Sequence, residues 1–513
     1  MPENFTPVMT ERKVRVRFAP SPTGPLHMGG VRTALYNYLF AKKYNGDFIL
    51  RIEDTDQARF VPGAESYIIE SLKWCGISPN EGQGFGGDKG PYKQSERKKI
   101  YGAYVQKLLD SGNAYYAFDT PDDLNEMRER AKTMKMPNWQ YNGITRGSMK
   151  NSLTLPANEV EKLLEGGAAY TVRIKMPRNE EVRFHDEIRG WVIVNTNNLD
   201  DKVLFKSDGM PTYHMANIVD DHLMEVTHVI RGEEWLPSAP LHVLLYQYLG
   251  WEDTMPKFAH LPLILKPDGN GKLSKRDGDR LGFPVFPLEW KDPTTSEVSS
   301  GYREKGYFPE AFVNMMVFLG WNPGTSQELF SLEELTQAFS LDRVGKSGAK
   351  FDPDKTKWFN QQYLRAKSNE ELGQLLGNLV EGEFDSSFLA AVAGMMKERA
   401  SFPVELSSGT YFFTAPEVYD EKTQRKKWKE ETPDRMRALA KVFESVEPFY
   451  ASNIENAFKQ FLIDEELGMG AVLPNFRLLL TGQGMGPSMF QIAELLGKEE
   501  TLKRMDSGIL KLA

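Results

Sequence analysis

Apolar and polar residues alternate near the N-terminus in a way that predicts a strand followed by a helix. Val14, Val16 and Phe18 are separated by arginines, which is the two-residue period of a half-buried strand. Prolines and a glycine interrupt this pattern between residues 20 and 25. Apolar residues then return at the spacing of one buried helical face, at Val31, Ala34, Leu35, Tyr38 and Leu39. The chain is therefore predicted to pass from a strand through a turn into a helix.

The same alternation of strand and helix continues to about residue 94 and resumes after residue 210. Phe48, Leu50 and Ile52 predict a second strand, and the apolar spacing at residues 68–72 predicts a second helix. A further strand is expected at 226–231, with a helix after Pro237. Strands that alternate with helices are typical of an open parallel sheet.

Two other parts of the chain have a different character. Residues 95–210 mix a helical segment at 101–109 with strand-like segments at 170–175 and 191–194, and we interpret them as an α+β insertion between the halves of a nucleotide-binding fold. Strand signals vanish from about 351 to 513. The prediction is an α/β, Rossmann-like domain split between 1–94 and 211–259, with an inserted domain at 95–210, a linking domain at 260–350 and an all-α region of two subdomains at 351–513.

The predicted turn carries a short string that suits an anion. His27, Gly29 and Gly30 stand where the helix is expected to begin, and the exposed N–H groups and helix dipole favour a negative charge there. Glycine also lacks the Cβ that would hold a nucleotide away from the backbone. The alternative is ordinary helix capping by the histidine.

A second basic string lies far away in the sequence. Lys272, Ser274 and Lys275 fall in a segment bracketed by Asp-Gly and Asn-Gly pairs, which predicts a loop with little packing of its own. A helix start on one side and a lysine loop on the other can grip a triphosphate. The alternative is a solvated basic hairpin.

Composition narrows the class of protein without identifying it. The 513 residues suggest three or four domains, and 40% of them are hydrophobic, which is enough for real cores. The single cysteine, Cys75, excludes an internal disulfide and a cysteine-cluster zinc site, and we expect it to be buried beside Trp74. No apolar run has the length of a membrane span, so a soluble cytoplasmic protein is expected.

The net charge of −8 does not exclude a polyanionic ligand if basic residues cluster. One such group is dense near the C-terminus: Lys422, Arg425, Lys426, Lys427 and Lys429. A role in binding RNA and a purely solubilising role are both open for this group.

Several blocks in order along the chain resemble those of bacterial-type glutamyl-tRNA synthetases, which are class I aminoacyl-tRNA synthetases. The blocks are RFAPSPTG at 17–24 with the His27 string, RIEDTD at 51–56, GPYKQSER at 90–97, SDGMPTYH at 207–214, VIRGEEW at 229–235 and KLSKR at 272–276. Fainter landmarks stand at Trp358-Phe359-Asn360 and Leu495-Leu496-Gly497-Lys498.

The resemblance implies a function. The chain would activate L-glutamate with ATP and Mg²⁺ to glutamyl-adenylate and transfer it to the 3′ end of tRNA(Glu), with cognate tRNA bound before activation becomes efficient. The insertion would hold the tRNA acceptor end, and the helical region would read the anticodon, near Pro487 and Met489. A cytoplasmic monomer without a zinc site or a membrane partner is expected.

The resemblance also implies roles for individual residues. The ATP-binding set is His27, Gly29, Gly30, Lys272, Ser274 and Lys275. The glutamate-binding set is Arg17, Ser21, Glu53, Tyr213, Asn217 and Arg231. In this set the Arg231 position pairs with the side-chain carboxylate of glutamate and the Glu53 position receives its α-amino group. The alternative is that Arg17 and Arg231 pair within Glu53-Asp54 or Glu233-Glu234, and that Tyr213 is a core residue.

The chain departs from the family pattern at some positions, and other functions are possible. Gly30 stands where the class signature usually has a second histidine, and no function is evident for the long stretch between Arg276 and Pro309. Asp220-Asp221 looks like a structural turn, and the remaining histidines lack a metal-ligand spacing. The alternatives are a synthetase that also charges tRNA(Gln), a glutaminyl-type synthetase, a small-molecule nucleotidyltransferase and an inactive tRNA-binding paralogue.

Overall fold

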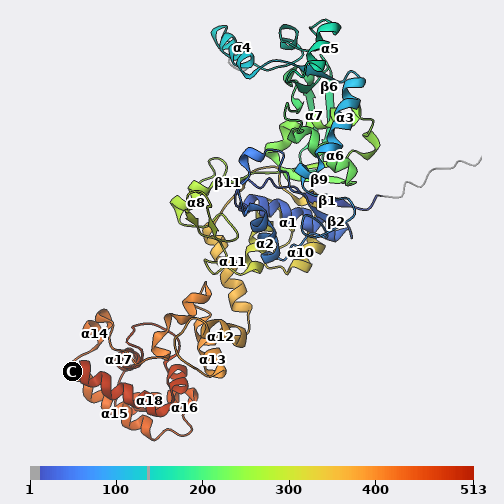
Figure 1. Ribbon diagram of the computed structural model, residues 1–513. Coiled ribbons are helices and arrows are strands. Elements are labelled where there is room, and N and C mark those ends of the chain that lie inside the picture. The colour runs from blue at the N-terminus through green and yellow to red at the C-terminus, as the bar shows by residue number, and fades with distance from the viewer. Residues whose placement is uncertain (1–11, 136–138, 513) are drawn as a thin grey trace, which may run out of the picture. The chain divides into compact units, whose positions relative to one another are not determined.

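The computed structural model describes residues 12–135 and 139–512, which fall into two compact units that divide after Thr356. Figure 1 shows the order of helices and strands along the chain. The alternation of strands and helices predicted from the sequence lies in the first unit. The described part of the second unit consists of helices and connecting segments.

Two sheets form the centre of the first unit. Parallel strands β1 (Arg15–Phe18), β2 (Asp47–Leu50) and β3 (Glu81–Gly82) make a three-stranded sheet. The second sheet has the order β7-β6-β10-β9, with bounds Gly190–Asn195, Glu181–Asp186, Lys257–Leu261 and His228–Gly232. In this sheet β10 is parallel to both β6 and β9, and β7 is antiparallel. The two sheets meet at β1, where the N–H of Thr227 donates to the carbonyl of Arg15 at 2.8 Å.

Strand β1 is buried along its whole length, so the predicted half-buried strand is wrong. Arg15 and Arg17 are 8% and 3% exposed. A parallel sheet with helices on both faces leaves its central strands no polar side. The two arginines are instead neutralised in the interior, Arg15 by Asp47 and Glu81 and Arg17 by Asp221.

Helix α1 (Met28–Lys43) begins where the sequence predicted and packs beside β1 and β2. Its predicted apolar face is buried except for Tyr38, which is half-buried, and Tyr36 and Phe40 on other sides are buried as well. Helices α9 (Pro309–Phe318) and α10 (Leu332–Ala338) lie against it, and the Tyr36 hydroxyl donates to the carbonyl of Val317 at 2.9 Å. Because it is covered by later segments, α1 is buried on more than one stripe.

The segment at 95–210 contributes to two sheets. One is a separate antiparallel sheet of order β4-β5-β8, with bounds Ala114–Ala117, Thr171–Ile174 and Val203–Phe205. The α-helices of the segment 95–210 are α3 (Lys98–Asp110), α4 (Pro121–Thr133) and α5 (Ala157–Glu165). The other two strands of this segment, β6 and β7, belong to the sheet that contains β9 and β10.

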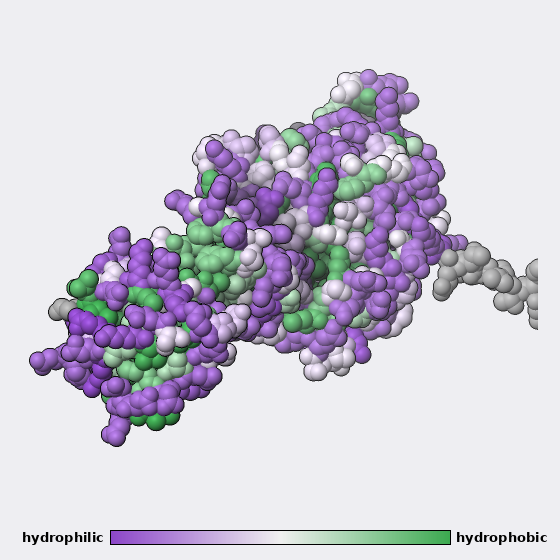
Figure 2. Space-filling view, turned by 90° about the horizontal axis from the view of Figure 1, so that it is seen from below, coloured by the Kyte–Doolittle hydropathy of each residue, from purple (hydrophilic) through white to green (hydrophobic). Residues whose placement is uncertain are grey.

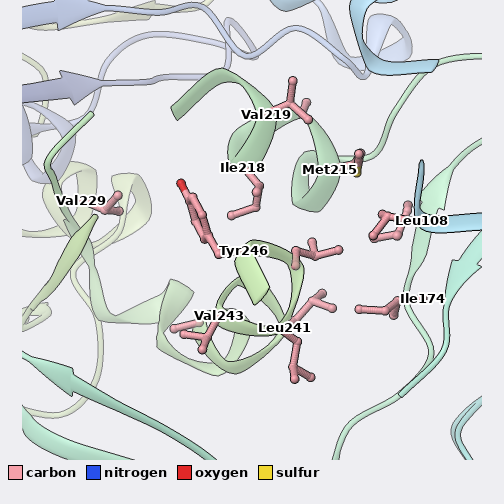
Figure 3. Close-up of a cluster of buried hydrophobic side chains, with 14 of the residues drawn as sticks. Leu108, Ile174, Met215, Ile218, Val219, Val229, Leu241, Val243 and Tyr246 are labelled. Carbon is pink, nitrogen blue, oxygen red and sulfur yellow. The ribbon is translucent and has the colours of Figure 1, made fainter. Parts of the chain in front are cut away.

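One hydrophobic core joins this segment to the rest of the first unit. Figure 3 shows Met215, Ile218 and Val219 of α6 (Tyr213–Leu223) gathered with Leu241, Val243 and Tyr246 of α7 (Ala239–Tyr248). Leu108 of α3 and Ile174 of β5 belong to the same buried cluster. Helices α6 and α7 are therefore fixed by apolar contacts on both sides of the segment boundary.

The lysine segment is only partly a loop. Ser274 caps helix α8 (Lys275–Leu281) in a reciprocal arrangement with Asp277, so the basic string ends in a helix start that the sequence analysis did not predict. The stretch that follows contains an antiparallel pair, β12 (Trp290–Lys291) and β13 (Val298–Ser299), which we call the hairpin. Strands β11 (Ile264–Leu265) and β14 (Ala349–Lys350) pair in parallel before and after it.

The second unit contains no strand among its described residues. Helix α11 (Pro353–Ala366) spans the division between the two units. The first unit also contains helix α2 (Ala64–Trp74). The remaining helices are α12 (Asn369–Gly377), α13 (Ser386–Met396), α14 (Glu421–Lys427), α15 (Thr432–Glu444), α16 (Ala451–Asp464), α17 (Met469–Thr481) and α18 (Met489–Leu512). Gly497 interrupts α18 with a positive φ of 82°, a backbone conformation that favours glycine.

Polar side chains cover most of the face seen in Figure 2, with apolar side chains in separate patches. None of the helices formed by residues 12–135 and 139–512 is long and apolar enough to cross a membrane. Cys75 is buried as predicted.

Candidate functional site

A cleft opens where the carboxyl ends of β1 and β9 meet the start of α1. It consists of three cavities that share Gly30 in their walls. The arginine cavity, of about 330 Å³, is lined among others by Arg17, Ser21, Glu53, Tyr213, Asn217 and Arg231. The histidine cavity, of about 300 Å³, is lined by His27, Gly29, Lys272 and Ser274, and the hairpin cavity, of about 410 Å³, by His27, Lys275, Trp290 and Asp292.

These cavities bring together residues that are distant in the sequence. All of the residues expected to bind ATP or glutamate line at least one of the three. Arg231 and Lys275 do not share a cavity, and Gly30 lies between their sites. This location, outside the carboxyl ends of parallel strands, is where open α/β sheets place ligands.

His27 is the N-cap of α1 and points one free donor into the cleft. Its Nδ1 accepts from the N–H of Gly29 at 3.2 Å, so the ring proton of the neutral form is on Nε2. That Nε2 is buried and has no protein partner in the described structure. Burial and the nearby Lys272 lower the pKa of His27 to about 4. At neutral pH the residue is therefore an uncharged N–H donor at a helix start, not a cation.

The two glycines after His27 differ in what they allow. A Cβ on Gly30 would lie 2.5 Å from the Cδ1 of Leu26, so a side chain there would displace Leu26. At Gly29 the nearest atom to a Cβ is the Nδ1 of His27, at 3.6 Å, an ordinary contact. A side chain on Gly30 would thus require the end of the Leu26 side chain to move, while Gly29 has room for a Cβ.

Both lysines of the basic string are paired with carboxylates. The Lys272 ammonium lies 3.0 Å from Glu234, and the Lys275 ammonium lies 3.3 Å from Glu297 on the hairpin. Ser274 donates its hydroxyl to Asp277 as part of the helix cap. Burial raises the pKa of Glu234, but a hydrogen bond from its own backbone N–H and the ammonium group of Lys272 lower it. The net result is a pKa below the usual value. The ammonium groups are thus held at the rim of the cleft by acidic partners.

The floor of the arginine cavity is Arg231, at the end of β9 and 5% exposed. Its Nη1 donates to the Tyr213 hydroxyl at 2.7 Å. Trp235 lies against Tyr213, with ring centroids 4.4 Å apart. Burial raises the pKa of Tyr213 although Arg231 opposes the shift, so the tyrosine keeps its proton and has an O–H to donate. Together these two residues present donors and a positive charge to the cavity.

Arg17 has a different environment in the same cavity. Its Nε and Nη2 donate to the two carboxylate oxygens of Asp221, at 3.0 and 3.2 Å. Arg51 donates to the same carboxylate at 2.7 Å, and it also contacts Glu53. Arg17 is thus paired within the protein, with an α6 carboxylate and not with Glu53 or Asp54 as the alternative had it.

Glu53 and Asn217 form a polar corner of this cavity. The Asn217 amide donates to Oε1 of Glu53 at 3.1 Å, and Arg51 donates to the same oxygen at 3.2 Å. Burial raises the pKa of Glu53, with Arg51 and Arg17 opposing the shift. The corner therefore carries a carboxylate in a buried site close to the arginines. Ser21 lies at the exposed edge of the cavity.

Several residues that shape the cleft were not identified from the sequence. Asp220 and Asp221 lie within α6 and not in a turn. Asp220 accepts from Arg97, Gln94 and Tyr101, which ties the GPYKQSER block to α6. Asp186, Glu234, His242, His260 and Glu297 were missed as well. Each of these residues forms a hydrogen bond or an ion pair with a residue elsewhere in the sequence, so no local sequence pattern identifies its role.

A separate cavity, of about 630 Å³, lies in the second unit. Its walls include Arg399, Tyr411, Arg477 and Pro487. Both arginines donate to the backbone of the 486–487 turn, and Nη1 of Arg477 is buried without a partner. Met489 is 2% exposed at the start of α18 and does not line this cavity. Of the two residues expected near the anticodon, the structure therefore places only Pro487 at an open site.

The described residues contain no group of three or more His, Cys, Asp or Glu side chains that could hold a metal ion. The basic residues Lys422, Lys426 and Lys427 of α14 are exposed, and Arg425 pairs with Glu421.

Comparison with known families covers both units. A family model described as the catalytic domain of class I tRNA synthetases (E and Q) matches residues 13–358. A second model, described as an anticodon binding domain, matches residues 362–509.

Individual relatives match over nearly the whole chain. The glutamate--tRNA ligase of Phocaeicola vulgatus is 60% identical over 504 residues, covering 97% of this chain and 98% of the relative. That of Cytophaga hutchinsonii is 55% identical over 509 residues, covering 98% of each chain. A crystal structure of a glutamate tRNA ligase from Elizabethkingia meningosepticum, in complex with its amino acid, is 51% identical, with a TM-score of 0.94 over 98% of this chain and 100% of that chain.

The environment of His27 generates a prediction about its titration. Burial, reinforced by Lys272, lowers its pKa from 6.5 to about 4, so the folded protein should keep this imidazole neutral through the physiological range. Between those two pH values the unfolded chain binds the proton more readily, so this residue makes the protein less stable as the pH falls through that window. Histidine-selective NMR, with the signal assigned by a His27→Asn variant, measures the midpoint.

Lys272→Ala is the matched perturbation. It should raise the pKa of His27 only in part, because burial is the larger cause. A wild-type midpoint near that of a free histidine would contradict this account of the site.

Proposed function

We propose that this chain, which belongs to the class I tRNA synthetases for glutamate and glutamine, is a glutamate--tRNA ligase. The observation that carries the proposal is the arginine cavity, where a guanidinium and a phenol face an opening next to a helix start suited to phosphates. The resemblance seen in the sequence is confirmed by the match of both family models and of full-length relatives.

The arginine cavity accounts for selection of glutamate. Arg231 and the O–H of Tyr213 would bind its side-chain carboxylate, and Glu53 its α-ammonium group, with Arg17, Asn217 and Ser21 as further polar contacts. The neutral amide of glutamine would leave the buried Arg231 without a counter-charge and would set its own N–H₂ against two donors. No observation on the described residues or their relatives favours the glutaminyl alternative.

Activation requires that the α-carboxylate of glutamate attack the α-phosphorus of ATP. The new O–P bond forms as the bond to the bridging oxygen breaks and pyrophosphate leaves. The Nε2–H of His27 and the amides at the start of α1 would donate to phosphate oxygens. Since the attacking group is already an anion, no general base is needed. A hydroxyl of the 3′-terminal nucleotide of the tRNA then attacks the acyl carbon, the bond from that carbon to the phosphate oxygen breaks, and AMP leaves with its phosphate accepting the hydroxyl proton.

The two lysines would complete phosphate binding. In the structure Lys272 and Lys275 are held by Glu234 and Glu297, so each must exchange a carboxylate for a phosphate oxygen when ATP binds. Both ion pairs are at least partly exposed, and exposed pairs contribute only about 0–1 kcal/mol. The exchange is therefore easy. Mg²⁺ would enter with ATP, bound by phosphate oxygens and water.

The second unit would bind the anticodon of tRNA(Glu). Its cavity offers two guanidinium groups and a tyrosine, which suit the edges and faces of an unstacked base. Burial and the neighbouring Arg399 lower the pKa of Arg477, although Tyr411 opposes the shift. Two like charges with an unpartnered Nη1 favour an acceptor in this place. Action in the cytoplasm, as a monomer, belongs to the same proposal.

The assay that tests the proposal is pyrophosphate exchange with glutamate and with glutamine, each with and without tRNA. Exchange is expected with glutamate and to be stimulated by tRNA(Glu). Arg231→Ala should raise the KM for glutamate by about 100-fold or more, since it removes one side of a buried charge pair, and should leave the KM for ATP nearly unchanged. Arg183→Ala, an exposed arginine on β6, is the control. Exchange with glutamine alone would refute the assignment.

The Lys275–Glu297 pair predicts an effect on ATP binding. Glu297→Gln frees Lys275 from a competing anion, so the KM for ATP should fall, by about two- to threefold given the small energy of exposed pairs. Steady-state exchange at varied ATP measures this. Glu289→Gln makes the same charge change at the exposed residue that precedes the hairpin and should have no effect. An unchanged or higher KM in Glu297→Gln would exclude the competition.

The anticodon cavity predicts a loss confined to tRNA. Arg399→Ala should raise the KM for tRNA(Glu) by about tenfold, the size typical of one lost base contact, without altering the KM for glutamate. Arg437→Ala on α15, an exposed arginine paired with Asp434, is the control in the same unit. Equal tRNA parameters for the two variants would remove this cavity from the proposal.

A further inference from the structure

Behind Arg231 lies a chain of buried polar groups that the reaction itself does not use. Asp186, His260 and Arg231 stand at the carboxyl ends of three neighbouring strands, β6, β10 and β9. His260 and Arg231 are register partners, and Asp186 and His260 are both fully buried. Nδ1 of His260 lies 2.6 Å from Oδ2 of Asp186, and Nε of Arg231 lies 3.1 Å from Nε2 of His260.

The hydrogen bonds fix where the proton of His260 resides. Nε of Arg231 can only donate, so Nε2 of His260 must offer its lone pair, and the ring proton must be on Nδ1, facing Asp186. Oδ1 of Asp186 accepts from the N–H groups of Ile188 and Arg189, at 3.0 and 2.8 Å, which fixes the carboxylate in turn. Burial lowers the pKa of His260, with Asp186 partly opposing the shift, so the ring is neutral.

The other neighbours of Arg231 are uncharged acceptors too. They are the Tyr213 hydroxyl, the carbonyl of Trp235 and Nδ1 of His242, the last two at 3.4 Å. Burial holds the pKa of His242 well below its usual value, and its Nε2 contacts His214. No carboxylate of the described chain forms an ion pair with Arg231, whereas Arg17 is paired with Asp221. The guanidinium is therefore oriented on several sides without being neutralised.

From this arrangement we infer that Asp186 and His260 are positioning residues for amino-acid selection. Asp186 holds His260 in the Nδ1–H form, and His260 orients the Arg231 guanidinium toward the substrate carboxylate while leaving its charge uncompensated. The inference rests on the proposed function, since the ligand of Arg231 is taken to be the side chain of glutamate. It assigns a role in the amino-acid site to a strand of the inserted segment.

The decisive variant is Asp186→Asn. Its Oδ1 can still accept from the two backbone N–H groups, but the amide now donates to Nδ1 of His260 and drives the ring proton to Nε2, where it opposes the N–H of Arg231. The Kd of L-glutamate, measured by calorimetry on the full chain, should rise by about 10- to 100-fold, the cost of an unsatisfied buried donor. The KM for ATP should stay within about twofold of wild type, which is well below that loss.

His260→Phe provides the test that a merely structural role would fail. A phenylalanine ring has no hydrogen-bonding nitrogen that could pass the polarity of residue 186 on to Arg231, so Asp186→Asn should cause no further loss of glutamate affinity in the His260→Phe background. Losses that simply multiply in the double variant would overturn the inference. Glu181→Gln, which changes an exposed carboxylate on the same strand, is the control.

A measurement on the unaltered protein guards against variants that fail to fold. Long-range proton–nitrogen NMR of the histidine rings should show His260 as the Nδ1–H tautomer, and an Nε2–H tautomer would overturn the inference. The outcome is separable from that of the proposed function. Failure of the wild-type chain to bind or exchange glutamate refutes the function, whereas wild-type binding with an unaffected Asp186→Asn variant refutes only the positioning role.

Discussion

The burial of arginine side chains on or next to the parallel strands is the constraint around which the first unit is organised. Burial of a guanidinium costs free energy unless acceptors bind its N–H groups and an opposite charge compensates its own. Arg15, Arg17 and Arg51 find carboxylates within the chain. Arg231 finds only neutral acceptors in direct contact. The difference between these two solutions separates arginines that are paired within the chain from one whose charge faces a cavity without a carboxylate partner.

Helix α6 connects these solutions. Successive turns carry Tyr213 and Asn217 toward the arginine cavity, and Asp220 and Asp221 toward the buried arginines. Its apolar side packs against α7 in the core seen in Figure 3. The positions of Tyr213 and Asn217 in the cavity wall are therefore set both by hydrophobic packing and by charge pairing. In a densely packed interior such a helix has little freedom to shift.

The sequence predicted the elements of both units well where a local pattern decides them. The strand and helix around His27, the helix after Pro237 and the all-helical C-terminal region follow from spacing alone, and the residues of the cleft came from family blocks. The period failed at β1, because alternating arginines look exposed until their partners, distant in the chain, are known. Ser274 was missed as a helix cap, although Asp277 three residues later is a local signal for it.

Partners of site residues were the least predictable part. His242 and His260 were considered only as metal ligands, since a sequence shows ligand spacing but not which strand lies next to which. Pairing between β6 and β10 brings Asp186 within reach of a histidine that lies 74 residues away in the chain. Similarly, the ion pair between Glu297 and Lys275 forms only because the hairpin lies beside Lys275 in the fold. Such contacts depend on topology and have no signature in a single sequence.

The membership of β6 in the central sheet bears on how this architecture can be divided or recombined. Residues 95–210 read along the sequence as a detachable insert, yet two of their strands extend the sheet that holds β9 and β10, and α3 and β5 share its core. A chimera that exchanged this stretch between relatives would also exchange Asp186, and with it the carboxylate that contacts His260 behind Arg231. The inserted segment and the arginine cavity are therefore not independently exchangeable parts of this fold.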